Sequence, residues 1–306
     1  MEILTLQDRR LLKTKEREVK RHMEEKSRKK VTGKFIILIV AIIAVVVAGL
    51  CFWYFQIKKP YDTAVSEFNI VAKQVAEKNS ELDNAIDSAQ AVLDANEPVY
   101  DETVINDVTL AISDANLEKR TIPELPDKTS DINSATQKLL EPLDYSSAIA
   151  NIADKQAALE NSVKQMKQIT NPSGDFIVQR LQGIDGISAC QAVTEDHDPN
   201  GNLNKQGGYT AAIYFSSSWI NQDDVYGSDI VDKGTDCGGC VEVYVSAEDA
   251  EKRNTYLSAF DGAGILNSGS HTVLGSIVIR TSSNLTATQQ NNLTQAISNR
   301  LLTLEE

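Results

Sequence analysis

The stretch FIILIVAIIAVVVAGLCFWYFQI, from Phe35 to Ile57, decides the architecture of this chain. It runs for 23 residues without a charge, and Gln56 is its one strongly polar residue. At about 1.5 Å per residue such a helix is about 34 Å long, enough to cross a hydrocarbon core about 30 Å thick. The stretch therefore predicts a transmembrane helix over residues 35–57, with the aromatic rings of 52–55 at one membrane interface.

Charge differs between the two sides of this stretch. Residues 1–34 hold 12 basic and 6 acidic residues, whereas residues 58–306 hold 18 basic and 37 acidic ones. Because basic flanks stay in the cytoplasm, we expect a cytoplasmic basic tail over 1–34 and an extracellular C-terminus, in a single-pass protein of the cell membrane. The apolar run is longer than that of a cleaved signal peptide, so it is typical of a signal anchor. The tail lacks interleaved aromatic residues, and no nucleic-acid partner is expected.

Residues 58–172 carry heptad-spaced apolar residues, typical of helices that pack along one seam. Four helices are expected, at about 61–96, 101–118, 130–140 and 145–169, and breaks that contain proline separate several of them. The second helix is expected to carry Val104, Val108, Ala111 and Ala115 on one face. The seam of the first helix consists of Tyr61, Val65, Phe68, Ala72, Val75, Asn79, Leu82, Ile86, Ala89 and Leu93. The pattern predicts an extracellular coiled-coil-like stalk or bundle. The first seam could pair within the chain or form a homodimer, and the sequence leaves both open.

Residues 173–306 have the composition of a separate domain, because 13 of the 16 glycines lie after Gly174. Strands are expected at 187–193, 209–215, 241–245 and 272–280, and helices at 176–181, from Ser246 to about 260, and from Thr286 to about 302. In the strand at 241–245, apolar residues alternate with Glu242 and Tyr244. The predicted fold class is a transmembrane helix, an all-α coiled-coil-like stalk and a C-terminal α+β domain.

One loop of this domain has the beginning of a calcium-binding pattern. Asp196, Asp198 and Asn200 alternate and are followed by Gly201, as in the first half of an EF-hand loop. The twelfth position is Gly207, where that loop needs a bidentate glutamate, and Pro199 stiffens its middle. Asn-Gly is also an ordinary turn former. A Ca²⁺ site at these three residues and a plain solvent-exposed loop are therefore both open, and no other cofactor is expected.

Three cysteines follow the predicted span: Cys190 and the C-x-x-C pair Cys237 and Cys240. An extracellular location permits a disulfide among them, and their odd number leaves one thiol over. Thioredoxin-like activity needs this motif at a helix N-terminus, whereas here it runs directly into the strand at 241–245. Zinc binding would need a further ligand such as His197 or His271. A structural disulfide or unreactive thiols are therefore expected ahead of redox or zinc chemistry.

Three segments of the distal region resemble a known class of proteins: VTEDHDPNGNLNKQGGYTAAIYF at 193–215, AEDAEKRNTYLSAFDG at 247–262 and GSHTVLGSIVIRTS at 269–282. They are similar to uncharacterised single-pass surface proteins of Gram-positive bacteria. The resemblance implies a membrane anchor, a helical stalk and a distal α+β domain. It implies no activity.

The function expected from these observations is non-enzymatic: a cell-surface protein that presents an α+β binding domain on a helical stalk. Its partner would be another envelope protein, a wall polymer or a host surface. No G-x-S-x-G elbow or phosphate-binding glycine motif is present in the sequence, so an enzyme is not expected. Two alternatives remain: a Ca²⁺-binding or sensing module built on the loop from Asp196 to Asn200, and a thiol-active envelope enzyme that uses Cys237 and Cys240.

Overall fold

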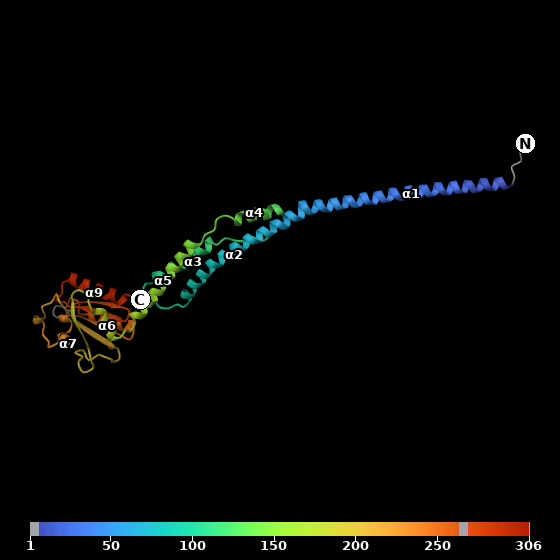
Figure 1. The fold of residues 1–306 in the computed structure, drawn as a ribbon. Coiled ribbons are helices and arrows are strands. Elements are labelled where there is room, and N and C mark those ends of the chain that lie inside the picture. The colour runs from blue at the N-terminus through green and yellow to red at the C-terminus, as the bar shows by residue number, and fades with distance from the viewer. Residues whose placement is uncertain (1–5, 263–268, 306) are drawn as a thin grey trace. The chain divides into compact units, whose positions relative to one another are not determined.

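The apolar run lies in a long helix near the N-terminus. The structure, a computed structural model, describes residues 6–262 and 269–305. Helix α1 (Leu6–Trp53) continues through a π-helical turn (Tyr54–Lys58) into α2 (Lys59–Asp94), as the blue end of the ribbon shows (Figure 1). The large apolar side chains from Phe35 to Ile57 are each 46–72% exposed. Among the described residues, this is the one helix long and apolar enough to cross a membrane.

The described chain divides into two compact units, and each is described by itself. The first takes in the chain up to Asn79 together with Arg120–Leu143. Its core packs α2 against α4 (Thr129–Leu139) through Ala64, Phe68, Val71, Val75, Ile132 and Leu139. The expected seam is confirmed at Phe68 and Val75, which pack within the chain. A homodimer through this seam stays a prediction.

Two polar side chains, those of Asn79 and Arg120, bind backbone carbonyl oxygens within this first unit. The Asn79 side chain is buried and donates from Nδ2 to the carbonyl oxygen of Arg120 at 2.9 Å. The Arg120 guanidinium donates to the carbonyl oxygens of Leu139, Glu141 and Pro142 at 3.3, 2.6 and 3.1 Å. The buried Asn79 of the seam thus binds one backbone carbonyl of the segment that returns to α2.

The second unit comprises Ser80–Lys119 and Asp144–Glu306. Helix α3 (Thr103–Glu118) lies beside α5 (Ser146–Gln168), and Lys155 pairs with Asp107 at 2.8 Å between them. The apolar face expected for α3 is buried, at Val104, Val108, Ala111 and Ala115. The four helices expected over 58–172 are therefore confirmed. Each of the two compact units contains part of the range 58–172. The domain boundaries expected from the sequence stay predictions.

The α+β part of the second unit contains one antiparallel sheet of five strands in the order β1-β2-β3-β5-β4. The strands are β1 (Ile187–Ala192), β2 (Ala211–Ser217), β3 (Gly238–Val243), β4 (Ser270–Leu274) and β5 (Ile277–Thr281). The single strand expected at 272–280 is instead the hairpin of β4 and β5. Its turn contains Gly275, whose φ of +60° suits glycine.

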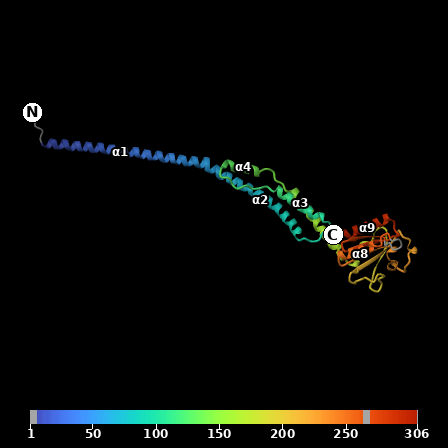
Figure 2. The same ribbon diagram turned by 180° about the vertical axis from the view of Figure 1, so that it is seen from behind.

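Helices cover both faces of this sheet. Helices α6 (Gly174–Leu181) and α9 (Ala287–Leu302) cover one face, where Leu181, Phe215 and Ile297 are fully buried. The opposite face packs against α7 (Ile230–Lys233) and α8 (Ala247–Ser258). Figure 2 shows α8 and α9 with the sheet from the reverse side. Both expected N-caps are confirmed: the Ser246 hydroxyl accepts from the Asp249 N–H, and Thr286 forms a capping box with Gln289.

Helix α5 joins the core of this α+β part. Ile169, directly after α5, is fully buried in the core beneath α6 and α9. The Gln165 and Gln168 side chains donate to the carbonyl oxygens of Leu302 and Leu301 at 3.1 and 2.5 Å. The last turn of α5 is therefore packed against the same core as the sheet.

Candidate functional site

The loop between β1 and β2 contains the residues expected to bind calcium. The Asp198 carboxylate accepts four hydrogen bonds: at Oδ1 from the Asn200 N–H (3.0 Å) and the Tyr209 hydroxyl, and at Oδ2 from the Asn202 and Leu203 N–H groups (2.6 and 2.8 Å). Burial favours the neutral acid, but the Tyr209 and backbone hydrogen bonds outweigh it and lower the pKa of Asp198. A carboxylate has about four lone-pair sites, so Asp198 is used by the loop itself.

The other two expected calcium ligands do not join Asp198 in an open oxygen cage. Asp196 is exposed to solvent. Asn200 points its amide nitrogen at the Tyr214 hydroxyl, at 3.1 Å. In this geometry Asp198 organises a turn, and the Ca²⁺ site at Asp196, Asp198 and Asn200 stays a prediction that the geometry does not favour.

The cysteines of the α+β part are free thiols in the structure. Cys190 pairs with Phe215 across β1 and β2, whereas Cys240 pairs with Tyr214 across β2 and β3. Because neighbouring residues of β2 point to opposite faces, Cys190 and Cys240 lie on opposite sides of the sheet. A bridge between these two would need a different strand register. The disulfide predicted among Cys190, Cys237 and Cys240 otherwise stays a prediction.

Burial makes these thiols poor nucleophiles. It raises the pKa of Cys237 to about 11, and it raises the pKa values of Cys190 and, more strongly, Cys240. The Cys237 Sγ also lies 3.1 Å from the carbonyl oxygen of Gly234 and 3.4 Å from that of Phe215. The reactive thiolate is therefore disfavoured at neutral pH, and this geometry gives no support to a thiol-active enzyme.

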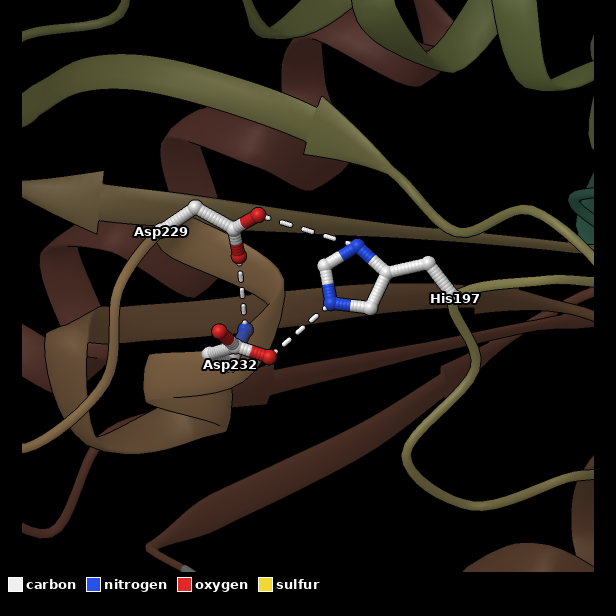
Figure 3. A group of neighbouring side chains, drawn as sticks. All are labelled: His197, Asp229 and Asp232. Carbon is white, nitrogen blue, oxygen red and sulfur yellow. Dashed lines mark hydrogen bonds and ion pairs between the residues drawn. The ribbon is translucent and has the colours of Figure 1, made fainter.

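A cluster of three other side chains lies beside the same loop (Figure 3). His197 belongs to the loop between β1 and β2, Asp229 is the N-cap of α7, and Asp232 lies in α7. His197 Nε2 is 2.9 Å from Asp232 Oδ1, and His197 Nδ1 is 3.6 Å from Asp229 Oδ2. One potential ligand atom from each residue lies within 4.8 Å of the other two. This cluster is the group among the described residues that could hold a metal ion.

Neighbouring polar groups orient the two carboxylates. Gln191 of β1 donates from Nε2 to Asp229 Oδ2 at 3.0 Å, and the N–H of Asp232 donates to Asp229 Oδ1 at 2.9 Å. The Ser228 hydroxyl donates to Asp232 Oδ2. These hydrogen bonds, with the attraction of His197, lower the pKa values of Asp229 and Asp232. The hydrogen bond to Asp232, followed by the charges of both carboxylates, raises the pKa of His197.

An open hollow adjoins the cluster. Asp223, Asp224, Tyr226 and Ser228 line it, and Asp232 belongs to both the hollow and the cluster. The Tyr226 side chain is 98% exposed. The nearby Lys233 turns its ammonium group to the carbonyl oxygen of Gln222, at 2.7 Å. Three carboxylates, Asp223, Asp224 and Asp232, therefore line an open hollow in which negative charge is in excess, and this favours cations there.

A second polar cluster is buried between the sheet and α8. Glu242 is fully buried, and it accepts hydrogen bonds from Arg253 at 2.9 Å and from Arg280 at 2.8 Å. The Tyr244 hydroxyl donates to the same carboxylate at 2.8 Å. Burial favours the neutral acid, but the two arginines outweigh it and lower the pKa of Glu242. With its oxygens occupied and no solvent access, this cluster is suited to holding α8 on the sheet.

The sequence suggested Asp198 as a Ca²⁺ ligand and His197 only as a possible zinc ligand beside the cysteines. It did not indicate the cluster of His197 with Asp229 and Asp232. Asp232 lies 35 residues from His197, so no local spacing links them. Comparison with protein-family models, with curated proteins and with solved structures found no match to this chain.

Proposed function

We propose that this chain is a single-pass membrane protein that holds a non-enzymatic α+β binding domain outside the cell. In this proposal residues 35–57 span the membrane, the basic tail lies in the cytoplasm, and everything from residue 58 onward is extracellular. The binding partner is an envelope protein, a wall polymer or a host surface.

The exposed apolar helix carries this proposal. From Phe35 to Ile57 the large apolar side chains are exposed and no other part of the described chain covers them. A water-exposed apolar surface of this length is strongly unfavourable, at about 25 cal/mol for each Å². Lipid would cover all sides of the helix at once. The excess of basic residues before it and of acidic residues after it supports the orientation.

Alkaline carbonate extraction of membranes from cells that express the full chain tests the anchor. Substitution of Ile39, Ile43 and Val46 by arginine should move the protein to the soluble fraction, because each arginine near a helix centre costs about 2.5–3.5 kcal/mol of insertion free energy. The matched control places three arginines at Ile70, Leu110 and Leu117, which are also exposed apolar residues on helices. The control should stay in the membrane. Equal behaviour of the two variants would remove the proposal.

Protease treatment of intact cells tests the orientation. The proposal expects external protease to remove epitopes in the α+β part and to spare an epitope tag on the N-terminus. Loss of the N-terminal tag with survival of the C-terminal part would reverse the orientation. Detergent-permeabilised cells, in which both should be digested, are the control.

A further inference from the structure

We propose that His197, Asp229 and Asp232 form a binding site for a divalent transition-metal ion, for which Zn²⁺ is the probe. The site joins two segments that are distant in sequence: the loop between β1 and β2 supplies the imidazole, and α7 with its N-cap supplies two carboxylates (Figure 3). Their ligand atoms already lie within 4.8 Å of one another. Metal binding is independent of whether the chain spans a membrane.

The two carboxylates keep the capacity to bind an ion. Each Asp229 oxygen accepts one N–H hydrogen bond, from Asp232 or from Gln191. Asp232 Oδ2 accepts one from Ser228, and its Oδ1 faces His197. Since a carboxylate offers about four lone-pair sites, both groups retain free ones. The imidazole faces a carboxylate on each nitrogen, and a metal ion would replace one of these contacts.

The surrounding hydrogen bonds are of the kind that supports a metal ligand. Gln191 is fixed at both ends of its amide, since its Oε1 also accepts from the Val231 N–H at 3.1 Å. The Ser228 hydroxyl fixes the rotation of the Asp232 carboxylate. Such outer-shell partners orient ligating groups before the ion arrives, which reduces the conformational entropy lost on binding.

The ligand set selects among metals. One imidazole nitrogen with two carboxylate oxygens suits Zn²⁺ and its first-row neighbours, whereas Ca²⁺ and Mg²⁺ prefer oxygen alone. The cluster is about two-fifths exposed at His197 and Asp232, so water can complete the coordination. Asp223 and Asp224 in the adjoining hollow add negative charge that favours a dication.

Isothermal titration of the full chain in detergent micelles with ZnCl₂ tests the site. The expected result is one tight site per chain, with much weaker binding of CaCl₂ in the same buffer. Loss of an outer-shell partner costs about 10–100-fold in metal affinity, so His197→Ala and Asp232→Asn should each weaken Zn²⁺ binding by about 100-fold or more. The matched control is His22→Ala, which removes an exposed histidine of α1 and should leave the affinity unchanged.

Two further measurements determine whether each variant is folded and which side chains bind the metal. Circular dichroism of each variant checks that it is folded, and Asp232→Asn changes a single atom and keeps the shape of the side chain. The visible spectrum of the wild-type chain loaded with Co²⁺ should show d–d bands without a thiolate charge-transfer band. Unchanged Zn²⁺ affinity in both folded variants, or a thiolate band that assigns the metal to the cysteines, would overturn the proposal.

Discussion

His197 and Asp198 are adjacent in the chain, yet their side chains differ in what they can still bind. Asp198 accepts four hydrogen bonds from its own loop and from Tyr209, which use the sites that a cation would need. His197 faces two carboxylates that each retain free lone pairs. A carboxylate pattern in a loop therefore indicates a metal site only when the hydrogen bonds of the loop leave those oxygens free.

Glu242 extends the comparison to a carboxylate wholly committed to the fold. Glu242→Ala leaves Arg253 and Arg280 buried without their anion, and should lower the free energy of unfolding by about 3–5 kcal/mol. Urea unfolding followed by Trp219 fluorescence in a Trp53→Phe background measures it. Glu251→Ala, at an exposed site on α8, is the control and should change stability by about 0.5 kcal/mol or less.

The same contact predicts a pH dependence with a definite sign. The pKa of Glu242 is lowered in the folded state, so its stabilisation is present above the unfolded-state pKa of about 4.3 and is lost as pH falls through the lower folded value. The stability difference between wild type and Glu242→Gln should therefore be largest at neutral pH and shrink in acid. A difference that grows in acid would contradict the ion cluster.

The reactivity of Cys237 tests whether burial keeps the thiol of the C-x-x-C motif unreactive. With a pKa of about 11, about one molecule in a thousand carries the thiolate at pH 8, against about a quarter for an ordinary cysteine. Alkylation by iodoacetamide should be about 200-fold slower in the native chain than in urea. Peptide mass spectrometry gives both rates. A native rate equal to that in urea would restore the case for thiol chemistry.

Asp198→Ala tests whether the Asp198 carboxylate stabilises its own loop. Loss of the four accepted hydrogen bonds should lower the free energy of unfolding by about 2 kcal/mol, because loop N–H groups lose their partner. Asp196→Ala, at an exposed position in the same loop, should have little effect. The Trp219 urea assay reports both. If Ca²⁺ instead raises the wild-type midpoint and each substitution removes that shift, the calcium prediction holds and the comparison fails.

Ser228→Ala has the smallest expected effect, and it tests the hydrogen bond that orients Asp232 in the proposed Zn²⁺ site. The variant keeps all three proposed ligands and removes the hydroxyl that orients Asp232. Zn²⁺ affinity should fall by about tenfold. Calorimetric titration measures it, with Ser188→Ala on the exposed part of β1 as the control. An unchanged affinity would show that the carboxylate needs no such orientation.

Local signals in the sequence predicted the local structure well. The helix faces at Val104 and Val108 and the caps at Ser246 and Thr286 depend on residues a few positions apart, and all are confirmed. The hairpin of β4 and β5 was expected as one strand, because only the two turn residues Gly275 and Ser276 separate the apolar ends of the two strands.

Features that depend on distant segments were not predictable in this way. Alternation in β3 sets Glu242 on the opposite face from Val241 and Val243, but it does not show that α8 covers that face and brings Arg253 to Glu242. The cluster of His197 with Asp229 and Asp232 depends on the position of α7 beside β1. Helix α7 is only four residues long, and the sequence did not indicate it. In both cases the missing information was tertiary contact, which periodicity does not contain.

Anomalous X-ray diffraction at the zinc edge, from crystals of the full chain grown with ZnCl₂, tests the contrast between His197 and Asp198 most directly. We expect one strong anomalous peak within bonding distance of His197, Asp229 and Asp232, and none at Asp198. A peak at Asp198, or density at the thiols of Cys237 and Cys240 with the His197 cluster empty, would contradict it.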